Sequence, residues 1–294
     1  MSAVCGFVSL VGEPNVGKST LLNRLVGEPL AIVSPKPQTT WNVVRGILTA
    51  EKGQVIFVDT PGLHQPRDLC GAHLAAEAKR ALAESDLVYW MADCRKGAVV
   101  PPEFDPEIVH SVPSFLVLNK VDLIEKPDLL PLIDYFGKLG PFREVVPVSA
   151  KTGDNVERLL QATWSYLPEG PPLFPADQLS DQPERELVKE FIREQMYLFT
   201  QQEIPYASAV KIEEFRERDD GRKLLIAAVI HVERDSQKGI VVGKGGEMIK
   251  KIGSAARRRI EAFLGTPVYL DLRVKVRDKW RQNKDSLREF GLQP

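Results

Sequence analysis

The sequence predicts an α/β fold, a mostly parallel sheet with helices on both faces, followed by a smaller α+β domain. Three observations support this prediction. Short apolar runs alternate with helical patterns through residues 1–167. A proline-rich stretch at 168–182 interrupts the alternation and is typical of an extended linker. Residues 183–294 then begin a second, shorter series of elements that ends in a basic tail.

The strands of the first domain are predicted from short runs of apolar and β-branched residues. The second and third runs flank Glu51–Gly53 and form a hairpin, so one strand is expected to be antiparallel at the edge of the sheet. Helical spacing appears at Ala75–Ser85 and Asn155–Leu167. The strand predictions are Cys5–Gly12, Val43–Ala50, Gln54–Asp59, Asp86–Asp93, Ser114–Lys120 and Glu144–Ala150.

The second domain is predicted in the order helix, strand, strand, loop, helix, strand. The apolar run Ile240–Val242, directly before the glycine loop, is interpreted as strand-like. The helix after the loop is expected to bury an apolar stripe and to leave its basic side chains exposed. The predicted ranges are Arg185–Phe199, Ala207–Phe215, Lys223–Glu233, Glu247–Leu264 and Val268–Val276.

The composition is that of a globular protein and predicts neither a cysteine metal site nor a membrane-spanning helix. Hydrophobic residues make up 43% and charged residues 27% of the 294 residues, as in soluble globular proteins. The three cysteines fit no metal-binding spacing and favour a reducing compartment. No signal peptide and no apolar run near the ~20 residues of a membrane span are visible. We therefore expect a cytoplasmic protein, and these features are also compatible with weak peripheral association with the inner face of the cell membrane.

Charge is distributed unevenly along the chain. The net charge is −1, but the last 59 residues contain 14 Lys+Arg against 6 Asp+Glu. A basic segment of this kind favours a polyanionic partner such as RNA, although a solvated helix face is the simpler explanation of charge alone.

The segment "GEPNVGKS" at Gly12–Ser19 matches the phosphate loop G-x-x-x-x-G-K-[ST] without a mismatch. Its backbone N–H groups and the following helix N-terminus suit phosphate oxygens. Lys18 is expected on the β- and γ-phosphates, and Ser19 on Mg²⁺. The nucleotide-binding residues predicted here are Glu13, Asn15, Val16, Gly17, Lys18, Ser19 and Thr20.

Two later segments predict which base is bound. "NKVD" (Asn119–Asp122) and "SAK" (Ser149–Lys151) each follow a predicted strand, where open parallel sheets bind ligands. Asp122 is suited to accept hydrogen bonds from the N1–H and the 2-amine of guanine. Adenine has no N1–H and no amine at that position. Lys120 is expected along the base and the Ala150 amide at the guanine oxygen.

The segment "DTPG" ends the predicted hairpin and suits a switch. Asp59 is placed to hold Mg²⁺, and the Gly62 amide is placed to meet the γ-phosphate. Thr39 or Thr40 is expected to add a hydroxyl to the metal, and spacing alone leaves the choice open; Thr40 is our prediction. We predict Lys18, Thr40 and Gly62 as the catalytic residues, and Ser19, Thr40 and Asp59 as the metal ligands.

A second glycine loop, "GKGG", lacks the Ser/Thr and the longer spacing of a triphosphate site. It matches the GXXG loop of KH domains, which clamps the backbone of about four nucleotides of RNA. A bare loop of this kind is usually a simple turn, but the basic tail and the following helix favour RNA. The predicted RNA-binding residues are Gly243, Lys244, Gly245, Gly246, Lys250, Lys251 and Arg257.

These segments, in order, resemble a translation-factor-type P-loop GTPase. With "QTT", "DTPGLH", "PEGPPL" and "VERDSQKGIVVGKGGEMIKKIG", the chain is similar to the Era family, a TrmE-Era-EngA-like GTPase domain joined to a type II KH domain. The resemblance covers nearly the whole chain. It implies GTP and GDP as ligands, Mg²⁺, the 30S ribosomal subunit as partner, and binding of the 3′ end of 16S rRNA during subunit assembly and rRNA maturation.

The chain departs from this resemblance at two positions. Trp41 stands where Arg is expected after the paired threonines. Leu63 occupies the position where Ras-like GTPases carry a water-orienting Gln, so hydrolysis must be organised differently. In similar GTPases an Asn at the position of Asn15 helps to bind K⁺, which makes K⁺ a hypothesis here. Two alternatives are an ATP-using phosphotransferase, which "NKVD" and "SAK" disfavour, and a non-enzymatic RNA tether with a structural nucleotide site, with which Leu63 is compatible.

Overall fold

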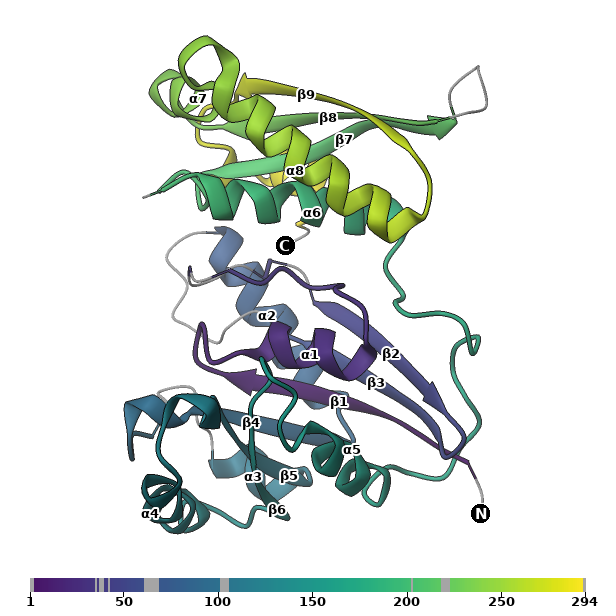
Figure 1. Ribbon diagram of the computed structural model, residues 1–294, viewed down its shortest axis with the longest axis vertical. Helices are drawn as coiled ribbons and strands as arrows, with labels where there is room; N and C mark the ends of the chain where they lie inside the picture. The colour runs from purple at the N-terminus through teal and green to yellow at the C-terminus, as the bar shows by residue number, and fades with distance from the viewer. Residues whose placement is uncertain are drawn as a thin grey trace. The chain divides into compact units, whose positions relative to one another are not determined.

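The computed structural model describes residues 3–34, 36, 40–41, 43–60, 69–100, 106–201, 203–217 and 223–292. The chain divides into two compact units, the first made of Met1–Gln65 and Leu74–Asp181 and the second of Pro66–His73 and Gln182–Pro294 (Figure 1). Among the described helices, none combines the length and the apolar composition that a membrane crossing requires.

The first unit is built on a six-stranded sheet of order β2-β3-β1-β4-β5-β6. All neighbouring strands are parallel except β2 and β3, which form the predicted hairpin at one edge. The strands are β1 (Val4–Gly12), β2 (Val44–Ala50), β3 (Gly53–Asp59), β4 (Leu87–Asp93), β5 (Ser114–Asn119) and β6 (Glu144–Val148).

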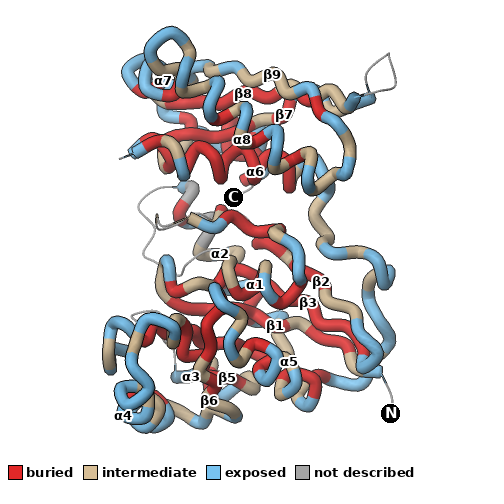
Figure 2. The backbone as a smooth tube through the Cα atoms, viewed as in Figure 1, coloured by how far each residue is buried: buried red, intermediate tan, exposed pale blue. Residues whose placement is uncertain are grey.

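Helices cover both faces of this sheet, so its central strands are continuous apolar runs. On one face, Trp90 packs in a cluster with Leu82, Val109 and Phe136 from three helices. On the other face, Tyr89 shares a hydrogen bond with Thr163. Figure 2 shows the resulting burial along the sheet. The helices are α1 (Lys18–Val26), α2 (Leu69–Ala83), α3 (Pro106–Ser111), α4 (Lys126–Gly137) and α5 (Val156–Trp164).

This topology brings the predicted nucleotide segments together at the carboxyl ends of the parallel strands. The phosphate loop follows β1, the "NKVD" segment follows β5, and the "SAK" segment follows β6. Since these strands are parallel, their carboxyl ends lie together, and the loops that follow them surround the same space. The short 3₁₀ helices η1 (Cys94–Lys96) and η2 (Val121–Leu123) follow the carboxyl ends of β4 and β5.

The segment predicted as a linker lies along the edge of the first sheet. Ile47 N–H of β2 donates to the Leu179 carbonyl at 2.8 Å, and Arg45 pairs with Asp181 at 2.7 Å. The Gln54 side chain, fully buried, donates to the Phe174 carbonyl at 2.9 Å. The segment therefore covers backbone groups that an edge strand would otherwise leave open to other chains. The domain boundaries drawn from sequence remain a prediction.

The second unit has a three-stranded sheet of order β7-β8-β9, with β7 and β8 antiparallel and β8 and β9 parallel. Helices α6 and α8 pack on each other and against this sheet. Trp280 and Leu287 near the C-terminus are fully buried in the same unit. The elements are α6 (Glu184–Phe199), β7 (Ser208–Glu217), β8 (Leu224–Val232), α7 (Asp235–Val242), η3 (Lys244–Gly246), α8 (Glu247–Leu264), β9 (Val268–Val276), η4 (Trp280–Gln282) and α9 (Lys284–Glu289).

The strand-like interpretation of Ile240–Val242 is wrong, because these residues end helix α7. The Gln237 side chain accepts hydrogen bonds from the backbone N–H groups of Glu233 at 2.9 Å and Arg234 at 3.2 Å. These bonds satisfy donors at the helix start. Val241 is completely buried, so capping and tertiary packing outweigh the weak helix propensity of the β-branched run.

Candidate functional site

The phosphate loop holds its lysine inside the loop. Lys18 is buried, and its Nζ donates to the carbonyls of Gly12 at 2.8 Å and Glu13 at 3.1 Å. Gly17 has a left-handed φ of 110°, and a Cβ there would lie 2.2 Å from Asn119 Nδ2. Glycine at this position is therefore required both by the backbone conformation and by the close approach of the "NKVD" segment.

Asn119 joins the three nucleotide segments to one another. Its Nδ2 donates to the Val16 carbonyl of the phosphate loop at 2.7 Å. Its Oδ1 accepts the Ala150 N–H of the "SAK" segment at 2.9 Å. The Ala150 amide that we expected at the guanine oxygen is thus engaged with Asn119 in this structure. In this structure Asn119 holds the phosphate loop and the "SAK" segment in place. A direct contact between Asn119 and the nucleotide stays a prediction.

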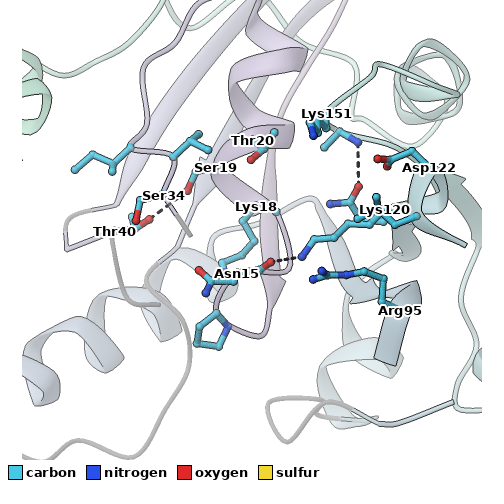
Figure 3. A pocket seen from close by; sticks show the side chains of 17 residues that line it. Asn15, Lys18, Ser19, Thr20, Ser34, Thr40, Arg95, Lys120, Asp122 and Lys151 are labelled. Carbon is cyan, nitrogen blue, oxygen red and sulfur yellow. Dashed lines mark hydrogen bonds between the residues drawn. The ribbon is translucent and has the colours of Figure 1, made fainter. Parts of the chain in front are cut away.

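The segments enclose a pocket of about 580 Å³ (Figure 3), within the range of small-molecule sites. Asp122 and Lys151 line one side, and Ser19 and Thr20 line the phosphate-loop side. Val33 and Leu123 are exposed and add apolar surface to the pocket wall. A flat aromatic base can pack against such a surface.

Helix α1, which follows the phosphate loop, holds the "SAK" segment in place. The Arg24 side chain, near the end of α1, donates to the Lys151 carbonyl at 2.5 Å and to the Ala150 carbonyl at 3.4 Å. The buried Ser149 hydroxyl accepts the Thr152 N–H at 3.1 Å. Ser149 therefore shapes the turn.

Three oxygen-bearing side chains meet at the other end of the pocket. Ser19 Oγ lies 2.5 Å from Asp59 Oδ2 and 3.3 Å from Thr40 Oγ1, and Thr40 Oγ1 lies 3.3 Å from Asp59 Oδ2. Asp59 is fully buried, and this burial raises its pKa. Its Oδ1 has no hydrogen-bond partner within the described part of the chain.

This oxygen cluster fits a hard divalent cation. Mg²⁺ prefers oxygen ligands and few protein side chains, and a buried carboxylate oxygen that lacks a partner is costly unless a ligand satisfies it. The Thr40 hydroxyl lies in this cluster, and the choice of Thr40 as the metal ligand stays a prediction. Thr39 and Gly62, the latter predicted at the γ-phosphate, lie outside the described residues.

Three residues around this pocket were not predicted from the sequence: Asp93, Arg95 and Arg24. Asp93 ends β4 and binds both Arg95 and Lys120, and Arg95 lines the pocket. The predicted residue Glu13 forms an ion pair with Lys96 through its side chain. The available signal was the sequence Asp93-Cys94-Arg95-Lys96 at a strand end, but only the strand order shows that this end lies between the nucleotide loops.

The second glycine loop is built to expose its backbone. Gly243, Gly245 and Gly246 have φ values of 74°, 60° and 82°, a conformation that favours glycine. A Cβ on Gly243 would lie 2.7 Å from the Met248 Cβ, whereas Cβ atoms on Gly245 or Gly246 would meet no described atom within 4 Å. The loop therefore packs on α8 at its start and is open to a ligand at its end.

Basic side chains follow this loop on the exposed side of α8. Lys244, Lys250 and Arg257 are exposed, as predicted. The Lys251 ammonium is also exposed but lies 4.5 Å from the centre of the Phe199 ring, in a cation–π contact. On the opposite side of the helix, Ile252, Ala256 and Ile260 are buried, which confirms the middle of the predicted stripe. Its other members, Met248, Ile249 and Phe263, are half-buried.

Two family models match the chain. The model described as "50S ribosome-binding GTPase" matches residues 7–120, and the model described as "KH domain" matches residues 203–281.

Curated relatives match over nearly the full length. GTPase Era of Geobacter metallireducens is 48% identical over 291 residues, covering 97% of each chain. GTPase Era of Heliobacterium modesticaldum is 45% identical over 289 residues, covering 98% of this chain and 96% of the relative.

Two solved structures have the same fold. A crystal structure of a variant of Aquifex aeolicus Era, bound to GDP·AlF4⁻, matches with a TM-score of 0.93 and 41% identity. A crystal structure of Era in complex with MgGDPNP and nucleotides 1506–1542 of 16S ribosomal RNA matches with a TM-score of 0.94 and 41% identity. Each alignment covers 99% of this chain and 100% of the other. The predicted fold class is confirmed.

Proposed function

The chain belongs to the Era family of GTPases with a KH domain, and from this we propose that it couples a GTP-to-GDP switch to the binding of single-stranded rRNA during assembly of the 30S ribosomal subunit. The observation that carries the proposal is the convergence of the phosphate loop, the "NKVD" segment and the "SAK" segment on one pocket that also contains Asp122. A second glycine loop with the open backbone of a nucleic-acid clamp lies on the same chain.

At the base end of the pocket, Asp122 accepts the N1–H and the amine of guanine, and adenine leaves this carboxylate without partners. Lys120 and Lys151 line the same end. The backbone N–H groups of the loop from Glu13 to Thr20 bind the phosphates, and Lys18 turns from the loop carbonyls toward the β- and γ-phosphates.

At the phosphate end, Ser19, Thr40 and Asp59 would hold Mg²⁺, which neutralises charge on the β- and γ-phosphate oxygens when it is bound. A related complex contains MgGDPNP, which supports this proposal. Lys18 and Thr40, together with Gly62, which lies outside the described residues, are proposed to contact the transferred phosphoryl group. They stabilise the charge that develops on it, and this stabilisation is the main protein contribution to phosphoryl transfer.

Potassium is expected to raise the rate of GTP hydrolysis. No polar side chain is available at Leu63 to orient the attacking water, and Asn15 is an exposed residue at the rim of the phosphate loop with a left-handed φ of 63°. A monovalent cation beside it would add positive charge near the phosphates. We expect kcat to be at least about tenfold higher in KCl than in NaCl and Asn15→Ala to remove the difference. Equal rates in the two salts would exclude this role.

The KH domain binds the 3′ end of 16S rRNA as a single strand. The loop from Gly243 to Gly246 clamps the sugar-phosphate backbone, and the exposed Lys250, Lys251 and Arg257 contact phosphates. A related structure with nucleotides 1506–1542 of 16S rRNA supports this partner. The same role places the protein in the cytoplasm. Peripheral membrane association is a further proposal, which co-sedimentation with anionic vesicles tests.

GTP is expected to change the RNA affinity of the full chain. Thr40 and Asp59 of the proposed Mg²⁺ site belong to segments 34–42 and 59–70, and we expect the γ-phosphate to change the conformation of these two segments. We expect the Kd for a 16S 3′-end RNA to differ at least about fivefold between GDP and a non-hydrolysable GTP analogue. Fluorescence anisotropy measures both values at one salt concentration. Equal values would leave a GTPase and an RNA-binding domain without coupling.

A further inference from the structure

Asp93 lies between the strands that carry two of the nucleotide loops. It ends β4, which is hydrogen-bonded to β1 on one side and to β5 on the other. Along these strands Met91 pairs with Gly12, and Asp93 pairs with Asn119. The strand order thus places this carboxylate beside both the phosphate loop and the "NKVD" segment.

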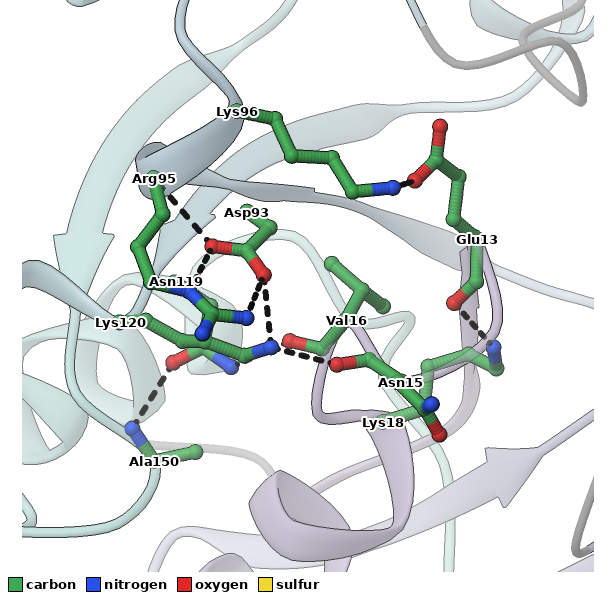
Figure 4. A network of polar contacts seen from close by, with 10 residues as sticks. All are labelled: Glu13, Asn15, Val16, Lys18, Asp93, Arg95, Lys96, Asn119, Lys120 and Ala150. Atoms are coloured by element: carbon green, nitrogen blue, oxygen red, sulfur yellow. Dashed lines mark hydrogen bonds and ion pairs between the residues drawn. The ribbon is translucent and has the colours of Figure 1, made fainter. Parts of the chain in front are cut away.

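The Asp93 carboxylate is nearly saturated with hydrogen bonds (Figure 4). Oδ1 accepts the Arg95 N–H at 3.1 Å and the Arg95 Nε at 3.0 Å. Oδ2 accepts Arg95 Nη2 at 2.6 Å and Lys120 Nζ at 2.7 Å. The side chain of Asp93 is 4% exposed and that of Lys120 is 19% exposed, so solvent screens the Asp93–Lys120 contact less than it screens a surface pair.

Lys120 extends this network to the phosphate loop. Its Nζ also donates to the Asn15 carbonyl at 2.5 Å. Its backbone has a left-handed φ of 71°, which is unfavourable for a non-glycine residue and persists only where surrounding contacts hold it. A continuous chain of contacts therefore runs from the Asp93 carboxylate through the Lys120 ammonium to the backbone of the phosphate loop.

We propose that Asp93 is a positioning residue of the guanine site, which acts through Lys120 and sets how long a guanine nucleotide stays bound. The carboxylate holds the ammonium between the phosphate loop and the base, so that the lysine stem keeps its place along the pocket wall. This inference rests on the proposed binding of guanine at Asp122. Asp93 itself does not line the pocket.

The charge state of Asp93 suits this role. Burial by itself would raise the pKa, but the hydrogen bonds from Arg95 and Lys120 outweigh burial and lower the pKa to about 2. A carboxyl with a lowered pKa in the folded state stabilises the protein above its ordinary pKa and loses that effect as the pH falls toward 2. Asp93 is therefore a permanently charged anchor near neutral pH.

The test is the rate of release of a fluorescent GDP analogue from the full-length protein. Asp93→Asn keeps an acceptor for the Arg95 N–H but removes the charge that holds Lys120. We expect release to be roughly tenfold to a hundredfold faster. The circular dichroism spectrum of the nucleotide-free variant should match that of the wild type, which excludes a general loss of structure as the cause.

A double-mutant cycle with Lys120→Met shows whether the effect passes through the lysine. We expect Asp93→Asn to accelerate release by less than about threefold when Lys120 is already replaced. Asp134→Asn, which removes the same charge from an exposed ion pair with Lys138 that does not line the pocket, is the matched control and should have a similarly small effect. If Asp93→Asn accelerates release as much in the Lys120→Met background as in the wild type, or if Asp134→Asn has as large an effect, the proposal is overturned.

Two further outcomes separate this inference from the proposed function. If wild-type protein binds GDP no better than ADP, the guanine site itself is wrong. If wild-type GDP binding is tight and guanine-specific but Asp93→Asn leaves release unchanged, only the role of Asp93 is wrong. Should Asp93→Asn fail to fold, the same cycle is run with Asp93→Glu, which keeps the charge and moves the carboxylate by one methylene group.

Discussion

Replacing Asp122 with Asn should change the base that the protein binds from guanine to xanthine. The carboxylate has two acceptors for the N1–H and the amine of guanine, whereas an Asn amide has one acceptor and one donor. The donor faces the guanine amine and finds no acceptor there. Xanthine has a carbonyl in place of the amine, so it matches the Asn amide. We expect GTP affinity to fall at least about a thousandfold and XTP affinity to rise correspondingly.

Competition of GTP, XTP and ATP against a fluorescent nucleotide measures this change. Asp128→Asn, at an exposed position in the first turn of α4, is the matched control and should leave all three affinities as in the wild type. Circular dichroism of the nucleotide-free proteins excludes unfolding as the cause. Retention of wild-type GTP preference by Asp122→Asn would mean that another group selects the base and that the assignment of this pocket end is wrong.

Introducing two aspartates into the second glycine loop should abolish RNA binding while leaving GTP hydrolysis intact. Lys244 and Gly245 are the variable positions of this loop, and both are exposed. Gly245 has a left-handed φ of 60°, which Asp tolerates better than most residues, and a Cβ there meets no described atom within 4 Å. The double variant Lys244→Asp, Gly245→Asp should therefore fold and present two carboxylates to the RNA phosphates.

We expect RNA affinity to fall at least about a hundredfold, because a phosphate-binding lysine is lost and two like charges face the backbone. Lys244→Asn, Gly245→Asn is the matched control: it has the same shape without the added charge and should lose much less affinity. The intrinsic GTPase rate, measured without RNA, should stay within about twofold of the wild type in both variants. Unchanged RNA binding by the Asp variant would move the RNA site away from this loop.

The identities of the two phosphate-binding loops were predictable because each lies within one short segment. The spacing of Gly12, Gly17 and Lys18 is itself the geometry of the first loop, since consecutive backbone N–H groups do the binding. The alternation of strands and helices in the first domain was predictable for the same reason. Hydrophobic periodicity within a window of about 11 to 18 residues shows which face of a helix or strand is buried.

The sequence by itself thus determined the α/β and α+β classes and the three short segments whose residues meet at the pocket, because these features depend on neighbours along the chain. The tertiary structure decided the rest. Helix α7 forms because Val241 is buried by distant residues. The segment after α5 lies on the sheet edge because Gln54 and Arg45 bind it. Asp93 joins the nucleotide site because strand order puts β4 between β1 and β5. Contacts between residues far apart in the chain leave no fixed spacing in a single sequence, so no local pattern could have shown them.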